Sequence, residues 1–490
     1  MRRVDDLRTS RVGRMAGISA ASVGVIYGYD LSNFASALRY ITDDFNLSTH
    51  QQEMVTTAAV IGQLAGTIGG GVLANAIGRK SSMVLVAAAY AVFAVLGAVA
   101  VVSLPSLVAV RLLLGLTVGV SVVVVPVFIA ECAPARVRGS LLVAYQLATV
   151  LGFIAGYMAA YLLADLHSWR WMLGLAAVPA VLALLLLLPI PDTARWYMLK
   201  GSVTPARQVL RCVEPEAEVE HDLAEIAGTL SETRGGALTD MLRRPYSRAT
   251  AFVVGLGFLA HVTGVNTVIY YGPRLFAAIG FAGDFALLVL PALAQVAGLA
   301  ATIVSLTLVD KLGRRPVLLS GIAMMIAADG LLIVVFTAGS GADGRVPGLE
   351  LGLGLAGVMV LAAGFSLGFG SLLSVYAGES FPGRLRSMGS SAMLTADLVG
   401  ATIVAAVFLT MLSSLGGAAT YTVFGVLALG AFLFVYWFAP ETKGTQLEEI
   451  RHFWENTGRP TDRAMPGILV PKARDEVIDP PAALPVVRER

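Results

Sequence analysis

Two charged signatures each occur twice in this sequence. The spacing Glu-x-x-Pro-x-Arg-x-Arg is found at 131–138 and again 248 residues later, at 379–386. A shorter motif, Gly-Arg followed by Lys or Arg, stands at 78–80 and at 313–315. Carboxylates and guanidinium groups form charge-assisted hydrogen bonds that can be made and broken, so these sets have the chemistry of a latch. The duplication itself predicts a chain built from two copies of one ancestral unit.

Two further charges of opposite sign, Asp30 and Arg111, fall inside apolar segments. A charge within a bilayer is costly unless it is paired or functional. Along helices that rise about 1.5 Å per residue, Asp30 lies about 22 Å and Arg111 about 30 Å from the same side of the membrane. These heights predict an ion pair, whose role is either functional or purely structural.

The segments that carry these residues are long and apolar. Apolar residues make up 56% of the 490 residues and charged residues only 14%, which argues against a soluble fold. The apolar residues form about twelve blocks, each long enough to cross a bilayer as a helix. The sequence therefore predicts an all-α membrane protein with twelve transmembrane helices in two six-helix bundles, at 15–190 and 250–440. The predicted spans are 15–38, 54–77, 82–103, 106–129, 140–164, 170–190, 250–278, 284–308, 316–338, 349–376, 388–413 and 418–438.

The distribution of basic residues predicts the orientation. Of the 35 Lys and Arg residues, Arg111 lies inside a span and four face one side, whereas all the others fall on the opposite side. Cytoplasmic loops retain Lys and Arg, so we expect a multi-pass protein of the plasma (inner) membrane with both termini in the cytoplasm. The same side carries a tail at 1–14, a polar loop at 191–249 with expected short helices, and a tail at 441–490 that we expect to be largely disordered.

Several function classes find no support in the sequence. The G-x-S-x-G spacing at 364–368 is that of hydrolases, but it lies in an apolar helix rather than at a strand-to-helix turn. The sequence contains no P-loop and no metal-ligand spacing. Cys132 and Cys212 both lie on the predicted cytoplasmic side and are expected to be unbridged. We therefore expect no enzyme activity, no metal or cofactor and no nucleic-acid partner, and a monomer in the lipid bilayer.

Several motifs, in order along the chain, resemble one family. They are Gly-Tyr-Asp at 28–30, Pro-Asp-Thr-Ala-Arg-Trp at 191–196, Gly-Val-Asn-Thr-Val-Ile-Tyr-Tyr at 264–271 and Pro-Glu-Thr-Lys-Gly at 440–444. Each motif is weak alone. Together with the two Gly-Arg loops they resemble the sugar porter branch of the major facilitator superfamily, over residues 15 to about 450.

This resemblance implies a secondary active transporter that imports a sugar with a proton by alternating access. Asp30 stands where proton-coupled members carry their titrating acid, and Arg111 matches the arginine of the family's helix 4. Protonation of Asp30 from outside would weaken its hold on Arg111 and let the loaded carrier turn inward, and release of the proton inside would reset it.

The loop charges are expected to form a cytoplasmic latch, paired when the inner side is closed and parted when it opens. The positive-inside rule alone accounts for the repeated Arg residues but not for the repeated Glu residues. Asn75 stands where the family's first Gly-Arg loop usually has Asp, while Asp310 keeps it in the second, so the N-terminal set is expected to be the weaker. The latch residues are Arg79, Glu131, Arg138, Arg195, Arg314, Glu379, Arg386 and Glu441.

The resemblance also implies a substrate site. Gln146 and Asn266 occupy positions that bind sugar hydroxyls in the family, and Tyr270 and Tyr271 resemble its outer gate. Amides and hydroxyls suit a solute rich in hydroxyl groups. Each lone polar residue has an alternative role in a hydrogen bond between helices.

Other positions depart from the family's lining. Ala260 and His261 replace a pair of Gln residues, and Asp397 begins a dipeptide that replaces a polar-aromatic pair. His261 and Asp397 bring ionisable groups, which could contact an amino sugar or another cationic solute or belong to a proton path. Asp329 is a further acid in the predicted ninth helix, which is usually peripheral, so we do not assign it to the site.

Two other functions stay open on the sequence alone. One is a transporter of a polyol, amino sugar or other organic solute, and the other is a non-transporting nutrient sensor that signals through its tail. The presence of both Asp30 and Arg111 favours transport.

Overall fold

This computed structural model describes residues 15–133, 135–213, 216–232, 238–243, 246–338, 348–381 and 383–443. The predictions for the tail at 1–14, for the tail beyond residue 443 and for the side chain of Arg138 lie outside the described residues. Within the described part, every regular element is a helix.

The helices before the polar loop are α2 to α8. Residues 15–21 are helical as well and are separated from α2 only by a turn at Ser22. The bounds are α2 Val23–Phe45, α3 Thr49–Ile77, α4 Arg79–Val99, α5 Leu104–Cys132, α6 Ala135–Leu162, α7 Trp169–Leu175 and α8 Ala177–Leu187.

Four short helices follow in the polar loop, and eight more complete the chain. The loop contains α9 Ala194–Leu199, α10 Val203–Val213, α11 Glu216–Glu232 and α12 Leu238–Leu242. The second half contains α13 Ser247–Val262, α14 Val265–Ile279, α15 Asp284–Leu312, α16 Arg314–Ala338, α17 Gly348–Leu367, α18 Phe369–Glu379, α19 Gly383–Ser414 and α20 Gly417–Phe438.

Eleven helical segments of the described residues are long and apolar enough to cross a membrane. They match eleven of the twelve predicted spans. The remaining predicted span corresponds to α2, where Asp30, Arg39, Asp43 and Asp44 add four charges to one helix and lower its mean hydropathy. Only Asp30 of these four residues is buried by neighbouring helices, whereas Asp43 and Asp44 are exposed in the last turn of α2.

Three predicted spans are each formed by two helices in the structure. The predicted span 250–278 is divided into α13 and α14 by Gly264, whose φ of +96° is readily adopted only by glycine. The spans 170–190 and 349–376 are likewise divided, near Ala176 and Gly368. Breaks of this kind expose backbone groups and often mark binding sites in transporters.

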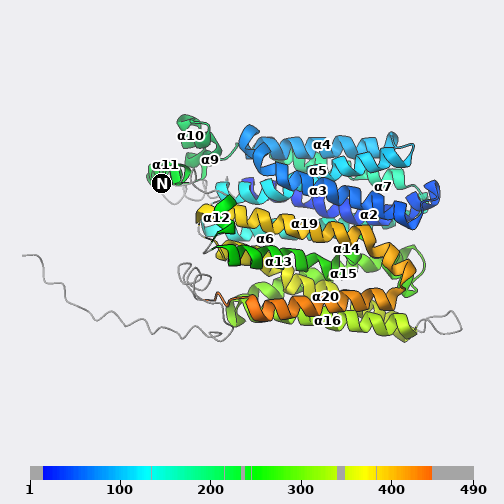
Figure 1. The fold of residues 1–490 in the computed structure, drawn as a ribbon. Coiled ribbons are helices and arrows are strands. Elements are labelled where there is room, and N and C mark those ends of the chain that lie inside the picture. The colour runs from blue at the N-terminus through cyan, green and yellow to red at the C-terminus, as the bar shows by residue number, and fades with distance from the viewer. Residues whose placement is uncertain are drawn as a thin grey trace, which may run out of the picture.

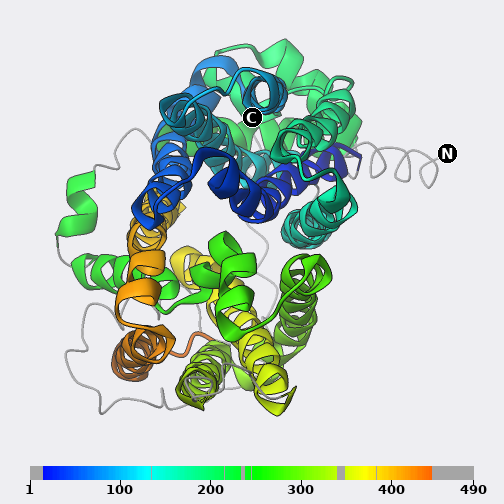
Figure 2. The same cartoon turned by 90° about the vertical axis from the view of Figure 1, so that its right-hand side faces the viewer.

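The two halves lie side by side. In Figure 1, α3, α4 and α5 occupy the upper part and α16 and α20 the lower part, with the helix axes running roughly parallel. Figure 2 shows the two groups end-on, the blue and teal helices above the green, yellow and orange ones. Helices α9 to α11 lie beyond one end of the bundle, which we call the basic end because Arg79, Arg195 and Arg314 are also there. The other end is called the opposite end.

Within the N-terminal half, glycines allow very close helix contacts. A Cβ at Gly115 of α5 would lie 1.9 Å from the backbone oxygen of Ala59 on α3, and a Cβ at Gly28 of α2 would lie 1.9 Å from that of Thr149 on α6. Any side chain at these positions would separate the helices. These contacts fix α2 and α5, which carry Asp30 and Arg111.

The halves contact each other mainly through α19 with α3, α15 with α6 and α14 with α2. At the opposite end, Arg39 pairs with Asp284 at 2.9 Å. Glu53, only 1% exposed, accepts hydrogen bonds from the backbone N–H and the hydroxyl of Thr410 at 2.7 and 2.6 Å. The two halves are therefore joined by specific polar contacts at this end.

Candidate functional site

The two predicted intramembrane charges form an ion pair. Arg111 Nη1 donates to Asp30 Oδ1 at 3.0 Å and to Oδ2 at 3.3 Å, and both side chains are buried. Tyr90 of α4 donates its hydroxyl to Asp30 Oδ1 at 2.9 Å. The guanidinium carbon of Arg111 also lies 3.7 Å from the ring centroid of Phe34, a cation–π contact.

This arrangement compensates each charge more than once. A buried ion pair is strongly destabilised when one partner loses its charge, because the other charge is left without compensation. Protonation of Asp30 would therefore release Arg111 from its strongest partner, which is the chemistry of a switch. The sequence predicted the pair but not Tyr90, which lies in an apolar helix, or Phe34, which lies one turn from Asp30 on α2 and carries no charge of its own to draw attention.

Asn266 lies just after the break between α13 and α14. It is fully buried, and neither its Oδ1 nor its Nδ2 has a hydrogen-bond partner among the described residues. The neighbouring Thr267 differs, since its hydroxyl donates to Gly264 O at 2.8 Å. A buried amide with both atoms unpaired is costly. A solute hydroxyl could supply the missing hydrogen bonds of Asn266, because one amide offers both a donor and an acceptor.

The two tyrosines that follow have different surroundings. Tyr271 is fully buried, donates its hydroxyl to Ala405 O of α19 at 2.5 Å and packs on Phe408. Its φ of −133° is not helical and, with Pro273, it kinks α14. Tyr270 is 4% exposed. Tyr271 therefore ties α14 to α19, as a gate residue would need to do.

His261 and Asp397, which are far apart in sequence, contact each other in the structure. The ion-pair contact joins Nδ1 of His261, on α13, to Oδ1 of Asp397, on α19, and the side chains are 16% and 12% exposed. The imidazole also packs edge-on against Phe365. Both ionisable departures noted in the sequence thus belong to one pair.

Two residues of the N-terminal half complete these surroundings and were missed in the sequence. Tyr27 of α2 lies within hydrogen-bonding reach of Gln63 of α3 and close enough to Asp397 to interact electrostatically. Gln63 is 2% exposed. A buried Gln in an apolar segment was the available signal, but its direction around the helix axis could not be read from the sequence.

Gln146 lies on the face of α6 that points toward the C-terminal half. Phe153 and Tyr157 lie seven and eleven residues further along, on the same face, and Tyr157 donates to Val268 O of α14 at 3.4 Å. Gln146 itself is exposed. Among the described side chains, no hydrogen bond or ion pair joins Gln146 to Asn266, His261 or Asp397.

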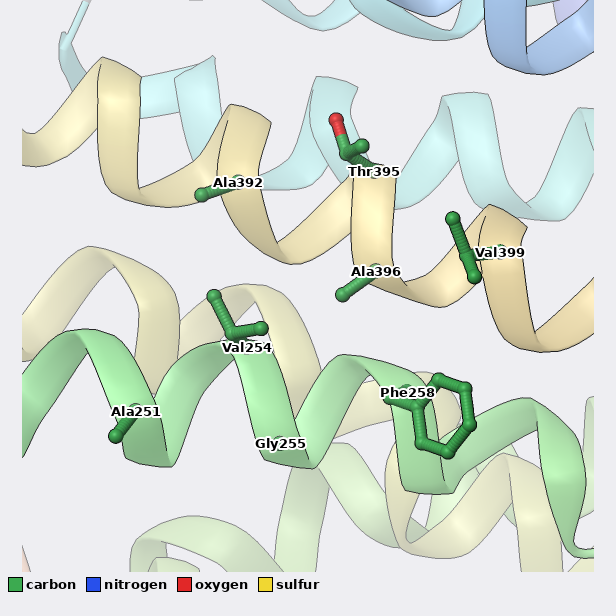
Figure 3. A pocket seen from close by; sticks show the side chains of 8 residues that line it. All are labelled: Ala251, Val254, Gly255, Phe258, Ala392, Thr395, Ala396 and Val399. Atoms are coloured by element: carbon green, nitrogen blue, oxygen red, sulfur yellow. The ribbon is translucent and has the colours of Figure 1, made fainter. Parts of the chain in front are cut away.

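An apolar groove of about 660 Å³ lies between α13 and α19. Figure 3 shows Val254 and Phe258 of α13 opposite Ala396 and Val399 of α19. The groove has almost no polar groups with which to hold a sugar. Of the polar candidates, His261 and Asp397 lie elsewhere on these two helices, and the others lie on α14 and α6.

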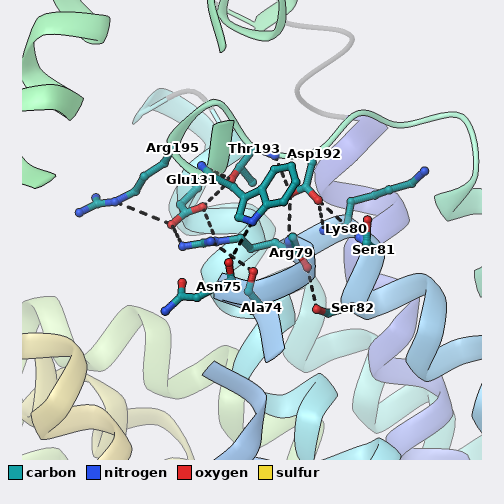
Figure 4. Close-up of polar contacts among 12 residues, drawn as sticks. Ala74, Asn75, Arg79, Lys80, Ser81, Ser82, Glu131, Asp192, Thr193 and Arg195 are labelled. Carbon is teal, nitrogen blue, oxygen red and sulfur yellow. Dashed lines mark hydrogen bonds and ion pairs between the residues drawn. The ribbon is translucent and has the colours of Figure 1, made fainter. Parts of the chain in front are cut away.

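At the basic end, Glu131 is the centre of an N-terminal cluster (Figure 4). Its Oε2 lies 3.1 Å from Arg79 Nε and accepts the hydroxyl of Thr193 at 2.7 Å, while Oε1 lies 3.9 Å from Arg195 Nε. Asp192 accepts backbone N–H groups of Arg79 and of the next residue at 3.0 and 3.2 Å. Its carboxylate therefore caps the start of α4, where the helix dipole favours negative charge.

The C-terminal half has a related cluster. Arg314 Nη2 donates to Glu379 Oε1 at 3.4 Å. Glu441 accepts the backbone N–H groups of Arg314 and Arg315 at 3.0 and 3.1 Å, which caps α16 as Asp192 caps α4. The Pro-Asp-Thr and Pro-Glu-Thr motifs are thus a third repeated feature, which the sequence analysis quoted without recognising their equivalence.

The predicted latch residues therefore divide between two clusters. Among the described residues, each ion pair at the basic end joins residues of the same half. Arg386 is exposed, and Arg138 lies outside the residues whose side chains are described. The latching role stays a prediction, in which this arrangement corresponds to the open state.

Comparisons with known proteins agree with this architecture. Residues 16–454 match the family model described as "Sugar (and other) transporter". The chain is 31% identical over 432 residues to the galactose-proton symporter of Escherichia coli K12, covering 88% of this chain and 92% of that protein. It is 30% identical over 446 residues to the arabinose-proton symporter of the same strain, covering 90% and 93%.

The fold is similar to solved transporter structures. The partially occluded inward open structure of the xylose transporter XylE from E. coli matches with a TM-score of 0.77 and 25% identity, covering 89% of this chain and all of that one. The structure of XylE, a major facilitator superfamily proton:xylose symporter, bound to 6-bromo-6-deoxy-D-glucose matches with a TM-score of 0.75 and 26% identity, covering 91% and 100%. The predicted all-α transporter fold is therefore confirmed.

Proposed function

Because this chain belongs to the sugar porter family of the major facilitator superfamily, we propose that it imports a sugar together with a proton by alternating access. The relatives named above, which it matches over nearly their whole length, are sugar-proton symporters. The chain is a membrane transporter rather than an enzyme. The observation that carries the coupling is the buried contact of Asp30 with Arg111 and Tyr90.

Proton coupling follows from the chemistry of that contact. When Asp30 is ionised, it holds Arg111 and so ties α2 to α5. A proton taken up on the carboxylate removes the attraction between Asp30 and Arg111, and α2 and α5 can then move relative to each other. The loaded carrier then turns inward, and loss of the proton to the cytoplasm restores the pair.

The solute site combines the C-terminal half with the facing helices of the N-terminal half. Asn266 supplies an unpaired donor and acceptor, Tyr270 an aromatic face, and Gln146 an exposed amide on the facing side of α6. Tyr271 ties α14 to α19 as part of a gate. Sugars present hydroxyls and a weakly apolar ring face, which these groups match.

The His261–Asp397 pair favours a neutral solute over a cationic one. A free carboxylate in the site would attract an ammonium group, but here His261 occupies one oxygen of Asp397. The second oxygen can accept a solute hydroxyl. Among the solute classes left open by the sequence, this geometry favours a neutral sugar.

The basic end is the cytoplasmic end in this proposal, and the protein lies as a monomer in the plasma (inner) membrane. Specific polar contacts join the halves at the opposite end, whereas the clusters at the basic end stay within their own halves. This combination supports an inward-facing conformation. In the outward-facing conformation, the two clusters would approach each other and latch the cytoplasmic side.

The test is transport by the purified protein in liposomes with an inward proton gradient, using labelled hexoses, pentoses, inositol and amino sugars. We expect accumulation of a neutral sugar by the native chain. Asp30→Asn should lose gradient-driven accumulation while retaining exchange of sugar across a membrane without a gradient. Accumulation that survives in Asp30→Asn would refute the coupling role, and a panel in which only amino sugars move would refute the substrate class.

A further inference from the structure

Asn266, the amide assigned to the solute, has no hydrogen bond of its own to hold it in place. Both amide atoms are buried and without a partner among the described residues. Its position is therefore set by the backbone that carries it, at the second residue of α14 and just after the break at Gly264. Any group that fixes this break also fixes the direction in which the amide is presented to a solute.

The first turn of α14 is held by Thr267, which directly follows Asn266. The backbone N–H and the hydroxyl of Thr267 both donate to Gly264 O, at 3.0 and 2.8 Å. A carbonyl oxygen has two lone pairs and can accept both bonds. The turn that carries the amide is thus closed by hydrogen bonds on either side of Asn266.

Tyr421 of α20 ties this turn to a different helix. Its hydroxyl lies 3.1 Å from that of Thr267. Because Thr267 donates its one hydroxyl proton to Gly264 O, Tyr421 is the donor in this contact. The Tyr421 ring is fully buried and stacks on Phe336 of α16, with ring centroids 5.8 Å apart and planes inclined by 13°. The stacking restricts the ring, so its hydroxyl gives Thr267 a well-defined anchor.

A second aromatic side chain of α20 covers the break itself. A Cβ at Gly264 would lie 3.0 Å from the ring of Phe424, so this ring packs directly on the glycine. Phe424 lies one turn along from Tyr421, with the ring centroids 5.8 Å apart. Helix α20 lies on the side of the C-terminal half that is remote from the N-terminal half (Figures 1 and 2). The break is therefore supported from behind, by a helix that does not face the other half.

We propose that Tyr421 is a positioning residue for the solute. Through its hydrogen bond with Thr267 it fixes the first turn of α14 and so directs the Asn266 amide toward the solute hydroxyls. Tyr421 does not contact the solute, since its ring is fully buried and its hydroxyl is occupied by Thr267. An amide that is already held in the bonding geometry loses less freedom when the solute binds, so binding is tighter. This inference rests on the proposed solute role of Asn266 and adds α20 to the elements that shape the site.

The test is the KM for sugar exchange in liposomes by Tyr421→Phe, which removes only the hydroxyl, with the hexose or pentose that the native chain accumulates best. Loss of one neutral hydrogen bond corresponds to a change of about twofold to tenfold. We expect the KM to rise by that factor, with the maximal rate nearly unchanged. Thr267→Val breaks the same bond from the other end and should raise the KM similarly. Thr267→Ser keeps the hydroxyl and should retain the native KM.

A comparison in the Asn266→Ala background separates positioning from a purely structural role. If Tyr421 acts through the amide, Tyr421→Phe adds no further rise to the KM of Asn266→Ala. A rise by the same factor in both backgrounds would overturn the proposal. A native KM in both Tyr421→Phe and Thr267→Val would overturn it as well.

Tyr376→Phe is the matched control. Tyr376 is fully buried on α18, in the same half, and donates its hydroxyl to Pro440 O at 3.2 Å, a bond that joins α18 to the chain after α20. Its loss should lower the unfolding temperature about as much as Tyr421→Phe but leave the KM at the native value. A Tyr376→Phe protein whose KM rises equally would refute a specific role for Tyr421. A native KM in Asn266→Ala would instead refute the solute site on which the inference rests.

Discussion

The main charged groups of the N-terminal half differ in their pairing from two buried polar residues of the C-terminal half. In the N-terminal half, Asp30 has both Arg111 and Tyr90 as partners, and Glu131 has Arg79, Thr193 and Arg195. In the C-terminal half, the described side chains of Asn266 and Asp329 are buried with no hydrogen-bond partner on either polar atom. In the N-terminal half these charges are already paired, so we expect them to act when a pair is broken. The C-terminal half offers unfilled bonding capacity that a solute or a proton can complete.

Removal of one N-terminal partner should have the largest effect. In Arg111→Gln, Asp30 would be left buried with only the Tyr90 hydroxyl, and an uncompensated buried charge costs about 3–5 kcal/mol. We expect a large fall in the thermal unfolding temperature of the purified protein and no accumulation of sugar.

The matched control for this variant is the double change Asp30→Asn with Arg111→Gln. It removes both charges and should recover most of the unfolding temperature, but not the coupling. If Arg111→Gln were as stable as the native protein, Asp30 would not depend on Arg111 for charge compensation, and the prediction would be wrong.

Removal of the C-terminal amide should affect solute binding rather than stability. Asn266→Ala deletes two unfilled hydrogen-bonding atoms, so the unfolding temperature should stay the same or rise. The hydrogen bonds lost with the solute are worth about 1–3 kcal/mol, which raises the apparent KM about fivefold to 150-fold. Initial rates of sugar exchange measure this KM.

Asn33 in the N-terminal half is the matched control for Asn266. It is also buried, and its Oδ1 lacks a partner among the described residues, but its Nδ2 donates to Met172 O at 2.7 Å, whereas both amide atoms of Asn266 are unpaired. Asn33→Ala should therefore lower the unfolding temperature and leave the KM nearly unchanged. If Asn33→Ala raised the KM as much as Asn266→Ala, the distinction between paired and open amides would fail.

Substitutions in the two clusters at the basic end should lower the unfolding temperature less than Arg111→Gln does. Glu131 contacts three side chains and is 12% exposed, whereas Glu379 contacts Arg314 and is 25% exposed. Buried charge-assisted bonds are worth about 1.5–3 kcal/mol and more exposed ones less. Glu131→Gln should therefore lower the unfolding temperature more than Glu379→Gln. The opposite order would agree with the expectation from Asn75 and Asp310 that the N-terminal set is the weaker.

The sequence predicted the helices and the Asp30–Arg111 pair because both depend on the rise along a helix, which is fixed. It did not predict Tyr90, Phe34 or Gln63. These contacts depend on how each helix is turned about its own axis, and α5 is apolar nearly all round, so no stripe reveals that rotation. The caps by Asp192 and Glu441 were missed for another reason, since only the folded chain brings these loops to the starts of α4 and α16.

The smallest expected effect is a shift in conformational population when a contact that joins the halves at the opposite end is removed. Arg39 and Asp284 are 41% and 34% exposed, so their ion pair is screened and worth at most about 1 kcal/mol. Asp284→Asn should move the population toward the outward-facing form by no more than about fivefold. Glu53→Gln breaks a contact that is only 1% exposed and should move it further. Labelling of a cysteine introduced at Gln146, in a chain whose Cys132 and Cys212 are replaced by serine, measures both shifts in the presence and absence of sugar. Gln146 is exposed and lies on the face of α6 toward the C-terminal half, so we expect the inward-facing form to open it to the cytoplasm and its labelling from that side to fall in each variant. It should fall more for Glu53→Gln, because the buried Glu53–Thr410 contact holds the two halves together at the opposite end more strongly than the exposed ion pair does.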